Sequence, residues 1–190
     1  MSWIVFIFLV VYGTVRLGLS IRGQLRYLLL RRRLPARPGP LALPGHLTLG
    51  LQRAVAESHA ARAHLVDAIR AIGTVLIIDP DVPLGCVRDY RYRMAVLSAW
   101  SAANHCLRAF EELDEGDRSR LEAIGCDVDR YRHAIARLAA PFKVAKRARA
   151  LEPFPVDEVR TTCTAVAAMA HELALLEGRL GAAPSHPYRD

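Results

Sequence analysis

Residues 2–21 read SWIVFIFLVVYGTVRLGLSI, and this stretch decides the architecture that we expect for the chain. Residues 3–15 carry no charge. A helix of twenty residues is about 30 Å long, which matches the hydrocarbon core of a bilayer. Arg16 interrupts the run near its C-terminal end, where a long side chain can still reach the headgroups. The stretch therefore predicts one transmembrane helix.

The arginines around this helix are distributed on one side only. Met1 and Ser2 precede the apolar run, whereas a basic collar follows it, up to Arg37. The positive-inside rule then places the N-terminus outside and the rest of the chain in the cytoplasm, with the helix in the cytoplasmic membrane. The predicted membrane-interface residues, which would meet anionic headgroups, are Trp3, Arg16, Arg22, Arg26, Arg31, Arg32 and Arg33.

Two other interpretations of the apolar run remain open at this point. A cleaved signal peptide would have positive charge before the run and a small-x-small cleavage site after it, and residues 13–16 (GTVR) make a poor site. A buried core helix is the second alternative, and length is the criterion that disfavours it. We therefore expect a retained anchor.

The net charge of +7 belongs to the anchor region and not to the body, by which we mean residues 46–181. Residues 1–40 contain seven arginines and no Asp or Glu, so the basic and acidic residues of 41–190 balance. A neutral body disfavours nucleic-acid binding, because a nucleic-acid interface needs an extended basic track.

A chain of 190 residues suffices for one domain and an anchor. We expect four parts: an anchor with its basic segment at 1–34, a proline-rich linker at 35–45 (PARPGPLALPG), a cytoplasmic helical domain at 46–181 and a flexible tail at 182–190. Proline excludes a helix interior from the linker, which should be an extended spacer between membrane and body.

The body shows apolar residues at helical spacing and no convincing alternation of period two. The expected helices run from about 46 to 72, from about 83 to 113, over a short stretch from Asp117 to Gly125, from Asp127 with a kink or end at Pro141, and from about Pro155 to Gly181. The fold class is thus all-α: one N-terminal transmembrane helix, then an antiparallel bundle of about four main helices.

Residues 73–78 (GTVLII) do not fit this pattern neatly. Their β-branched side chains resemble a strand, but the sequence offers no second strand to pair with it. We expect the run to extend the preceding helix or to form an apolar connection, and a re-entrant membrane contact is the remaining alternative.

Motifs with a defined chemistry are absent from the sequence: there is no GxxxxGK[ST], GxGxxG, GxSxG or HExxH. The four cysteines form no CxxC pair, and we expect them to be reduced and mostly buried. Four residues interrupt or flank an apolar stripe and are weak candidates for binding a ligand or cofactor: Trp100, Asn104, His105 and Cys106. A buried asparagine that fixes helix register is the structural alternative for this group.

We expect, from these observations, a non-catalytic accessory or scaffold subunit of a cytoplasmic-membrane complex, without metal or cofactor. Its partners would be anionic lipid and integral-membrane or membrane-associated proteins, including further copies of this chain. A membrane-anchored bundle that binds a small ligand or cofactor, with or without enzymatic activity, is the alternative. A membrane-tethered nucleic-acid binder ranks third.

Overall fold

The computed structural model describes residues 3–30, 34–149 and 152–181, and it confirms the all-α prediction. Seven α-helices, one short 3-10 helix and two short strands make up this described part of the chain. In chain order they are α1 (Trp3–Leu30), α2 (Leu49–Ile78), η2 (Val82–Leu84), β1 (Cys86–Val87), α3 (Tyr90–Glu111), α4 (Glu115–Ala123), α5 (Val128–Ala136), α6 (Ala139–Arg147), β2 (Phe154–Pro155) and α7 (Val156–Arg179).

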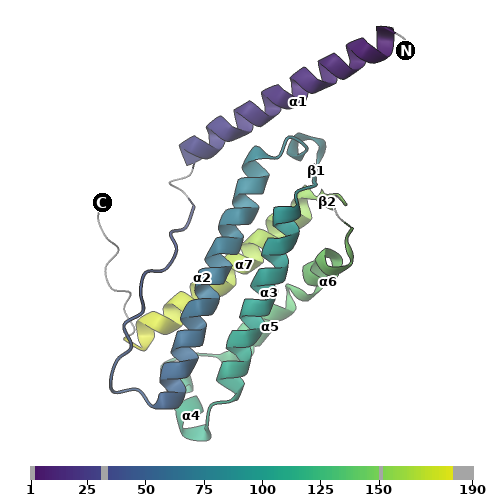
Figure 1. The fold of residues 1–190 in the computed structure, drawn as a ribbon. Coiled ribbons are helices and arrows are strands. Elements are labelled where there is room, and N and C mark those ends of the chain that lie inside the picture. Colours follow the sequence, from purple (N-terminus) through teal and green to yellow (C-terminus); the bar gives the residue numbers. More distant parts are fainter. Residues whose placement is uncertain (1–2, 31–33, 150–151, 182–190) are drawn as a thin grey trace.

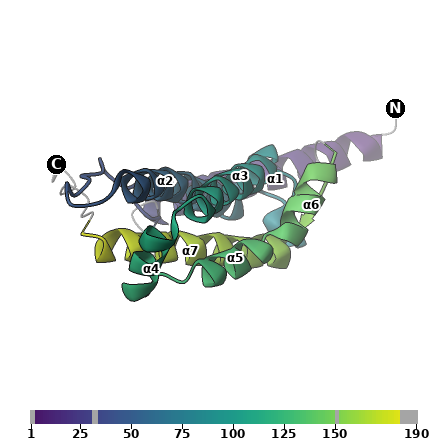
Figure 2. The same ribbon diagram turned by 90° about the horizontal axis from the view of Figure 1, so that it is seen from below.

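The body is an antiparallel bundle made of α2, α3, α7 and the consecutive pair α5 and α6 (Figure 1). Helices α2 and α3 form one layer, and α7 with α5 and α6 forms the other (Figure 2). Helices α5 and α6 together occupy one side of the bundle, because the helix is interrupted between Ala136 and Ala139. Pro141 lies in the first turn of α6, where its missing N–H is not needed. The predicted interruption at this proline is therefore confirmed, but a new helix follows it.

Helix α2 ends later than predicted, at Ile78 instead of about residue 72. The strand-like run 73–78 is helical, because Ile72 and Val75 are fully buried in the core and packing outweighs β-propensity. The helix stops at Asp79, whose extended backbone is the conformation that a following proline favours. This confirms the prediction that the run extends the preceding helix.

Helix α3 starts later than predicted, at Tyr90 instead of about residue 83. The carboxylate of Asp89 caps it by accepting the backbone N–H of Arg91 at 2.7 Å. The preceding residues form η2, a turn at Gly85 with φ +80° and strand β1. Strand β1 pairs antiparallel with β2, Cys86 opposite Pro155 and Val87 opposite Phe154. The sequence analysis missed this pairing because two residues per strand give no periodicity.

Residues 35–44 form no helix, as the prolines predict, and residues 45–47 form a turn, but the segment lies along α2 and does not separate α1 from the body (Figure 1). Arg70 donates a hydrogen bond to the carbonyl of Pro35 at 3.5 Å, and Arg37 lies 3.6 Å from Asp67. Leu41 packs against the core. The segment therefore returns along the bundle, which differs from the predicted spacer. The predicted flexible tail, residues 182–190, lies outside the described residues.

The core lies between the two layers and is closed by aromatic pairs. The rings of Tyr92 and Phe154 meet edge to face at 4.8 Å, and those of Phe110 and Tyr131 do so at 5.9 Å. The hydroxyl of Tyr92 donates to the hydroxyl of Thr162 at 3.3 Å, so its polar atom is satisfied inside the core. These contacts join α3 to α5, α7 and β2.

Candidate functional site

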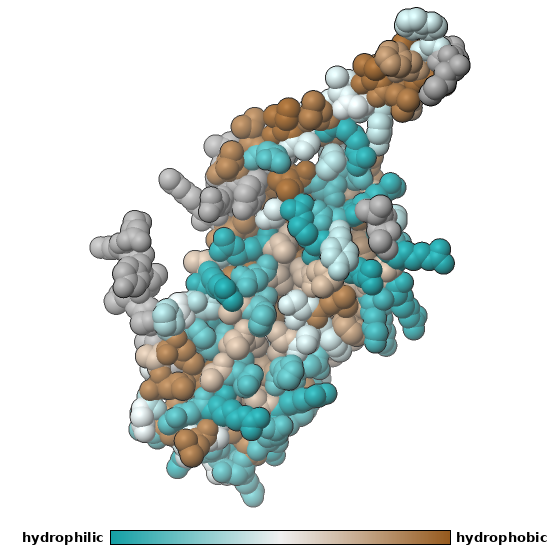
Figure 3. All heavy atoms as spheres, viewed as in Figure 1, coloured by the Kyte–Doolittle hydropathy of each residue, from teal (hydrophilic) through white to brown (hydrophobic). Residues whose placement is uncertain are grey.

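The outer half of α1 projects beyond the bundle and is apolar (Figure 1, Figure 3). Trp3 is 80% exposed at its end and packs edge to face on Phe6, with 6.3 Å between the ring centroids. Residues Val5–Arg26 are long and apolar enough to cross a membrane, and none of the most apolar 18-residue window within them is buried. The buried-core-helix interpretation is therefore wrong. A signal sequence would meet the same criteria of length and composition.

The inner half of α1 contacts the body through one face of small and polar residues. Arg16, Ser20 and Gly23 follow one another at intervals of four and three residues, so they lie on the same side of the helix. Gly23 is buried, and a Cβ added there would lie 2.8 Å from Cα of Ile78 and 2.9 Å from the carbonyl oxygen of Ile77. The two helix backbones therefore touch at this point, and only glycine permits it.

Arg16, on the same face of α1, forms an ion pair with Asp81. It lies one turn before Ser20 and two turns before Gly23. Nη2 of Arg16 donates to Oδ1 of Asp81 at 2.9 Å, and the two side chains are 44% and 8% exposed. Nε of Arg88 approaches the other oxygen of Asp81 at 4.0 Å. The Arg16 guanidinium also lies 5.7 Å from the centroid of the Tyr12 ring, a distance typical of a cation–π contact.

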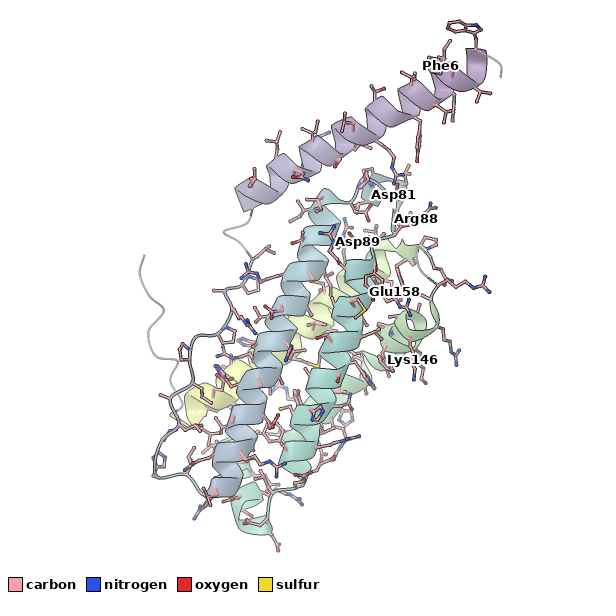
Figure 4. All side chains as sticks on the ribbon, viewed as in Figure 1. Phe6, Asp81, Arg88, Asp89, Lys146 and Glu158 are labelled. Atoms are coloured by element: carbon pink, nitrogen blue, oxygen red, sulfur yellow. The ribbon has the colours of Figure 1, made fainter. Side chains whose placement is uncertain are left out.

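The bundle end that receives α1 is called the tip here and comprises residues 77–91. Figure 4 shows Asp81, Arg88 and Asp89 gathered beneath the middle of α1. Asp79 accepts the backbone N–H groups of Asp81 at 2.8 Å and Arg88 at 3.4 Å. Partial burial raises the pKa of Asp79 above its usual value, against the effect of these two hydrogen bonds. Three aspartates of the tip, at 79, 81 and 89, thus lie close to two of its arginines, at 88 and 91, and to Arg16 of α1.

Asp89 and Arg91 form the second ion pair of the tip. Nε of Arg91 donates to both carboxylate oxygens of Asp89, at 3.0 and 2.9 Å. Burial alone would raise the pKa of Asp89, but the hydrogen bonds from Arg91 outweigh it and lower that pKa below its usual value. An open hollow of about 610 Å³ remains between α1 and the tip, lined by all six of these charged residues together with Ser20, Gln24, Ile78, Pro80 and Tyr90.

The predicted membrane-interface residues take different positions on α1. Trp3, Arg22 and Arg26 are exposed, as a lipid-facing role requires. Arg16 instead has a protein partner, because it is paired with Asp81. Arg31, Arg32 and Arg33 lie outside the described residues.

The structure does not bring the four candidate ligand-binding residues to one pocket. Trp100 stacks on Phe142, with 4.7 Å between ring centroids, and Asn104 donates to the Trp100 carbonyl at 2.8 Å. His105 is exposed on α3. Cys106 is fully buried, and this burial raises its pKa to about 12. The side chains of these residues therefore line no common pocket, although Asn104 bonds the Trp100 backbone within α3.

A buried charged cluster that the sequence analysis missed joins α2 to α7. Glu177 is almost fully buried, and its oxygens lie 2.6 and 2.9 Å from the Arg62 guanidinium and 3.3 Å from Nδ1 of His59. The signal in the sequence is a carboxylate within the apolar stripe that includes Leu173 and Leu176. The carboxylate of Glu177 is therefore bonded on both oxygens and links α7 to α2 inside the bundle.

No cluster of three or more His, Cys, Asp or Glu side chains that could hold a metal occurs in the described part of the chain. A hollow of about 670 Å³ lies between α3, α4 and α5 and is lined mainly by charged side chains such as Glu111, Arg118 and Arg132. Arg132 is already paired there with Glu111 at 2.9 Å. Among these features, the contact between α1 and the tip therefore gives the clearest indication of a function.

No protein-family model, curated protein or solved structure matches this chain.

Proposed function

We propose that this protein is a non-catalytic accessory or scaffold subunit of a cytoplasmic-membrane complex, anchored by α1 and presenting its helical bundle to partner proteins. The observation that carries the proposal is the outer half of α1, whose described side chains are exposed and apolar up to Val15. In water, an apolar helix without a covering surface is costly, and lipid is the environment that removes this cost. The anchor would confine the bundle to the membrane surface.

The fit between α1 and the body supports retention of α1. A signal peptide that is cleaved needs no complementarity to the mature domain, whereas Gly23 and Arg16 each match a specific partner on the tip. The arginines that follow the apolar run, among them the exposed Arg22 and Arg26, favour a cytoplasmic body.

The polar interior supports a role without catalysis. Glu177 is engaged by Arg62, and Asp117 accepts a hydrogen bond from Thr48 at 2.5 Å. Both contacts tie helices or their caps together. The separate positions of Trp100, Asn104, His105 and Cys106 favour this role over the alternative of a small ligand or cofactor bound by all four.

The end of the bundle far from α1 offers a surface for a protein partner. Leu49, the first residue of α2, is 84% exposed, and Leu43 in the preceding segment is also exposed. Apolar side chains gather at this end of the molecule in the space-filling view (Figure 3). Exposed apolar area at the end that faces away from a membrane is available for protein contact.

Co-purification tests the proposal. The full-length protein should be solubilised from its native membranes with a mild detergent and isolated at native expression level, beside a Leu49→Asp variant. We expect specific companions with the wild type, and fewer of them with the variant. A wild-type protein that purifies alone and monodisperse would contradict a scaffold role.

A further inference from the structure

Arg16 and Asp81 together set the depth of the body relative to the bilayer. If residues 2–21 fill the hydrocarbon core, Arg16 lies five residues, about 7 Å of helix, inside the cytoplasmic boundary. The guanidinium of Arg16 can reach from there to the headgroups, and Asp81 is bonded to it at 2.9 Å, so the tip is carried to the level of the headgroups. The ion pair and a full span therefore exist together only if the tip enters the membrane interface.

The contact at Gly23 prevents the body from moving along α1 toward its C-terminal end, away from the membrane. The backbones of α1 and α2 touch there, so the helices cannot slide past one another without separating. Only residues 3–15 project freely, which is about 20 Å of helix, against about 30 Å of hydrocarbon. The missing length lies in the part of α1 that is docked on the tip.

The side of α1 that faces away from the body is apolar along this docked part. Leu17, Ile21, Leu25 and Leu28 recur at intervals of four and three residues, and all four are exposed. These residues continue the apolar surface of the outer half. The lipid-facing surface therefore runs past the level of Arg16 and alongside the tip.

We infer that the tip is a second membrane-contact site, seated in the headgroup layer of an anionic bilayer, where Asp81 is the counter-ion of Arg16. This inference rests on the proposed membrane function and adds to it where and how the body meets lipid. It makes the α2–α3 connection a lipid-binding surface.

The exposed side chains of the tip suit a headgroup layer. Leu84 is 75% exposed and Tyr90 is 56% exposed, and Pro83 in η2 is exposed as well. An exposed leucine with a nearby tyrosine is the combination that interfacial segments use, an apolar body with a polar end toward the headgroups. Arg88, also exposed, can contact a lipid phosphate.

The carboxylates of the tip do not oppose this placement, because each is compensated. Asp81 is held by Arg16, Asp89 by Arg91, and Asp79 by two backbone N–H groups. An arginine without a partner inside the boundary is costly, and the pairing with Asp81 reduces this cost. The exposed Arg22 and Arg26 leave the junction of α1 and tip net positive, which favours an anionic surface.

Fluorescence quenching in vesicles tests the inference. An environment-sensitive fluorescent amino acid is placed at Leu84 in the full-length protein, with Leu9 in α1 as the positive control and Ser119 in α4, at the opposite end of the bundle, as the matched negative control. The proteins are reconstituted into vesicles of phosphatidylcholine and phosphatidylglycerol that carry a nitroxide at a shallow acyl position. We expect a blue shift and quenching at residue 84 and at residue 9, and neither at residue 119.

A Gly23→Leu variant, which removes the docked contact, should abolish quenching at residue 84 and leave it at residue 9, whereas Gly18→Leu should change neither. Quenching at residue 9 without quenching at residue 84 in the wild type would overturn the inference and leave the anchor intact. A blue shift at residue 84 without quenching would mean that protein covers the tip, which also overturns it. Absence of quenching at all three positions would overturn the membrane function itself.

Discussion

Replacing Gly23 with alanine should release α1 from the tip. The new Cβ would lie 2.8 Å from Cα of Ile78, whereas carbon atoms in contact are about 3.5–4.0 Å apart, so the helices must separate by roughly 1 Å. The atoms in conflict belong to the backbone and cannot rotate away. Overpacking of this kind costs about 1–3 kcal/mol, and we expect about 2 kcal/mol to be lost from the docked state.

Gly18→Ala is the matched control for this variant. Gly18 lies in the same helix, and a Cβ added there meets nothing within 4 Å. Alanine has a helix propensity about 1 kcal/mol better than glycine, and this gain applies to both variants, docked or undocked. The difference between the two variants therefore isolates the contact with Ile78.

Hydrogen exchange followed by mass spectrometry, on the full-length protein in detergent micelles, measures the effect. The last turn of α2 includes the amide of Asp79, which donates to the carbonyl of Val75 at 2.9 Å. A loss of about 2 kcal/mol in docking should speed exchange in this turn up to about 30-fold in Gly23→Ala relative to Gly18→Ala. Equal exchange in the two variants would refute the tight backbone contact.

Three further predictions concern stability and reactivity. Glu177→Gln should lower the free energy of unfolding by roughly 3 kcal/mol, because it leaves a buried guanidinium without its carboxylate. Glu172→Gln loses an exposed ion pair and should lower it by less than about 1 kcal/mol. Urea unfolding compares the two variants, and equal losses would contradict the buried pair. Because burial raises the pKa of Cys106 to about 12, its thiol should resist iodoacetamide at pH 8 in the native protein and react after unfolding. Mass spectrometry of the labelled peptide measures the reaction, and rapid labelling of the native protein would contradict the prediction. The pKa of Asp89 is lowered on folding, so its ion pair stabilises the protein at pH values above the ordinary pKa of 3.8, and this stability is lost as the pH falls through the pKa of the folded state. The melting temperature of Asp89→Asn should therefore be below that of the wild type at pH 7 and converge with it in acid. A constant difference at all pH values would count against the pairing.

Local signals in the sequence were sufficient to predict several helix ends, although α4 begins at Glu115 with Asp114 as its cap, and the prediction that Asp117 opens it was wrong. Asp127 caps α5 by accepting the Arg130 N–H at 2.8 Å, and Gly125 and Gly181 take the positive φ of helix ends, as predicted. These features depend on residues that are neighbours in the chain. For the apolar run 73–78 local signals left a helix extension and an apolar connection open, and packing of the buried Val75 accompanies the helical form.

Contacts between distant segments could not be predicted in this way. Gly23 looks like an ordinary interruption of an apolar stretch, and its role appears only when the end of α2 lies against it. Asp81 and Arg16 are 65 residues apart, and nothing in the spacing of either points to the other. The four residues around Trp100 were grouped because they are close in sequence, although successive positions on a helix face different directions.

Alkaline extraction combined with reporter fusions tests the central claim, that α1 holds the body on the cytoplasmic face of the membrane. The full-length chain is expressed with a fluorescent protein or with alkaline phosphatase at its C-terminus, and membranes are washed with carbonate at high pH. The account predicts that the intact polypeptide stays in the membrane pellet, with a fluorescent fusion and an inactive phosphatase. Release of the polypeptide by the wash, or an active phosphatase, would contradict it.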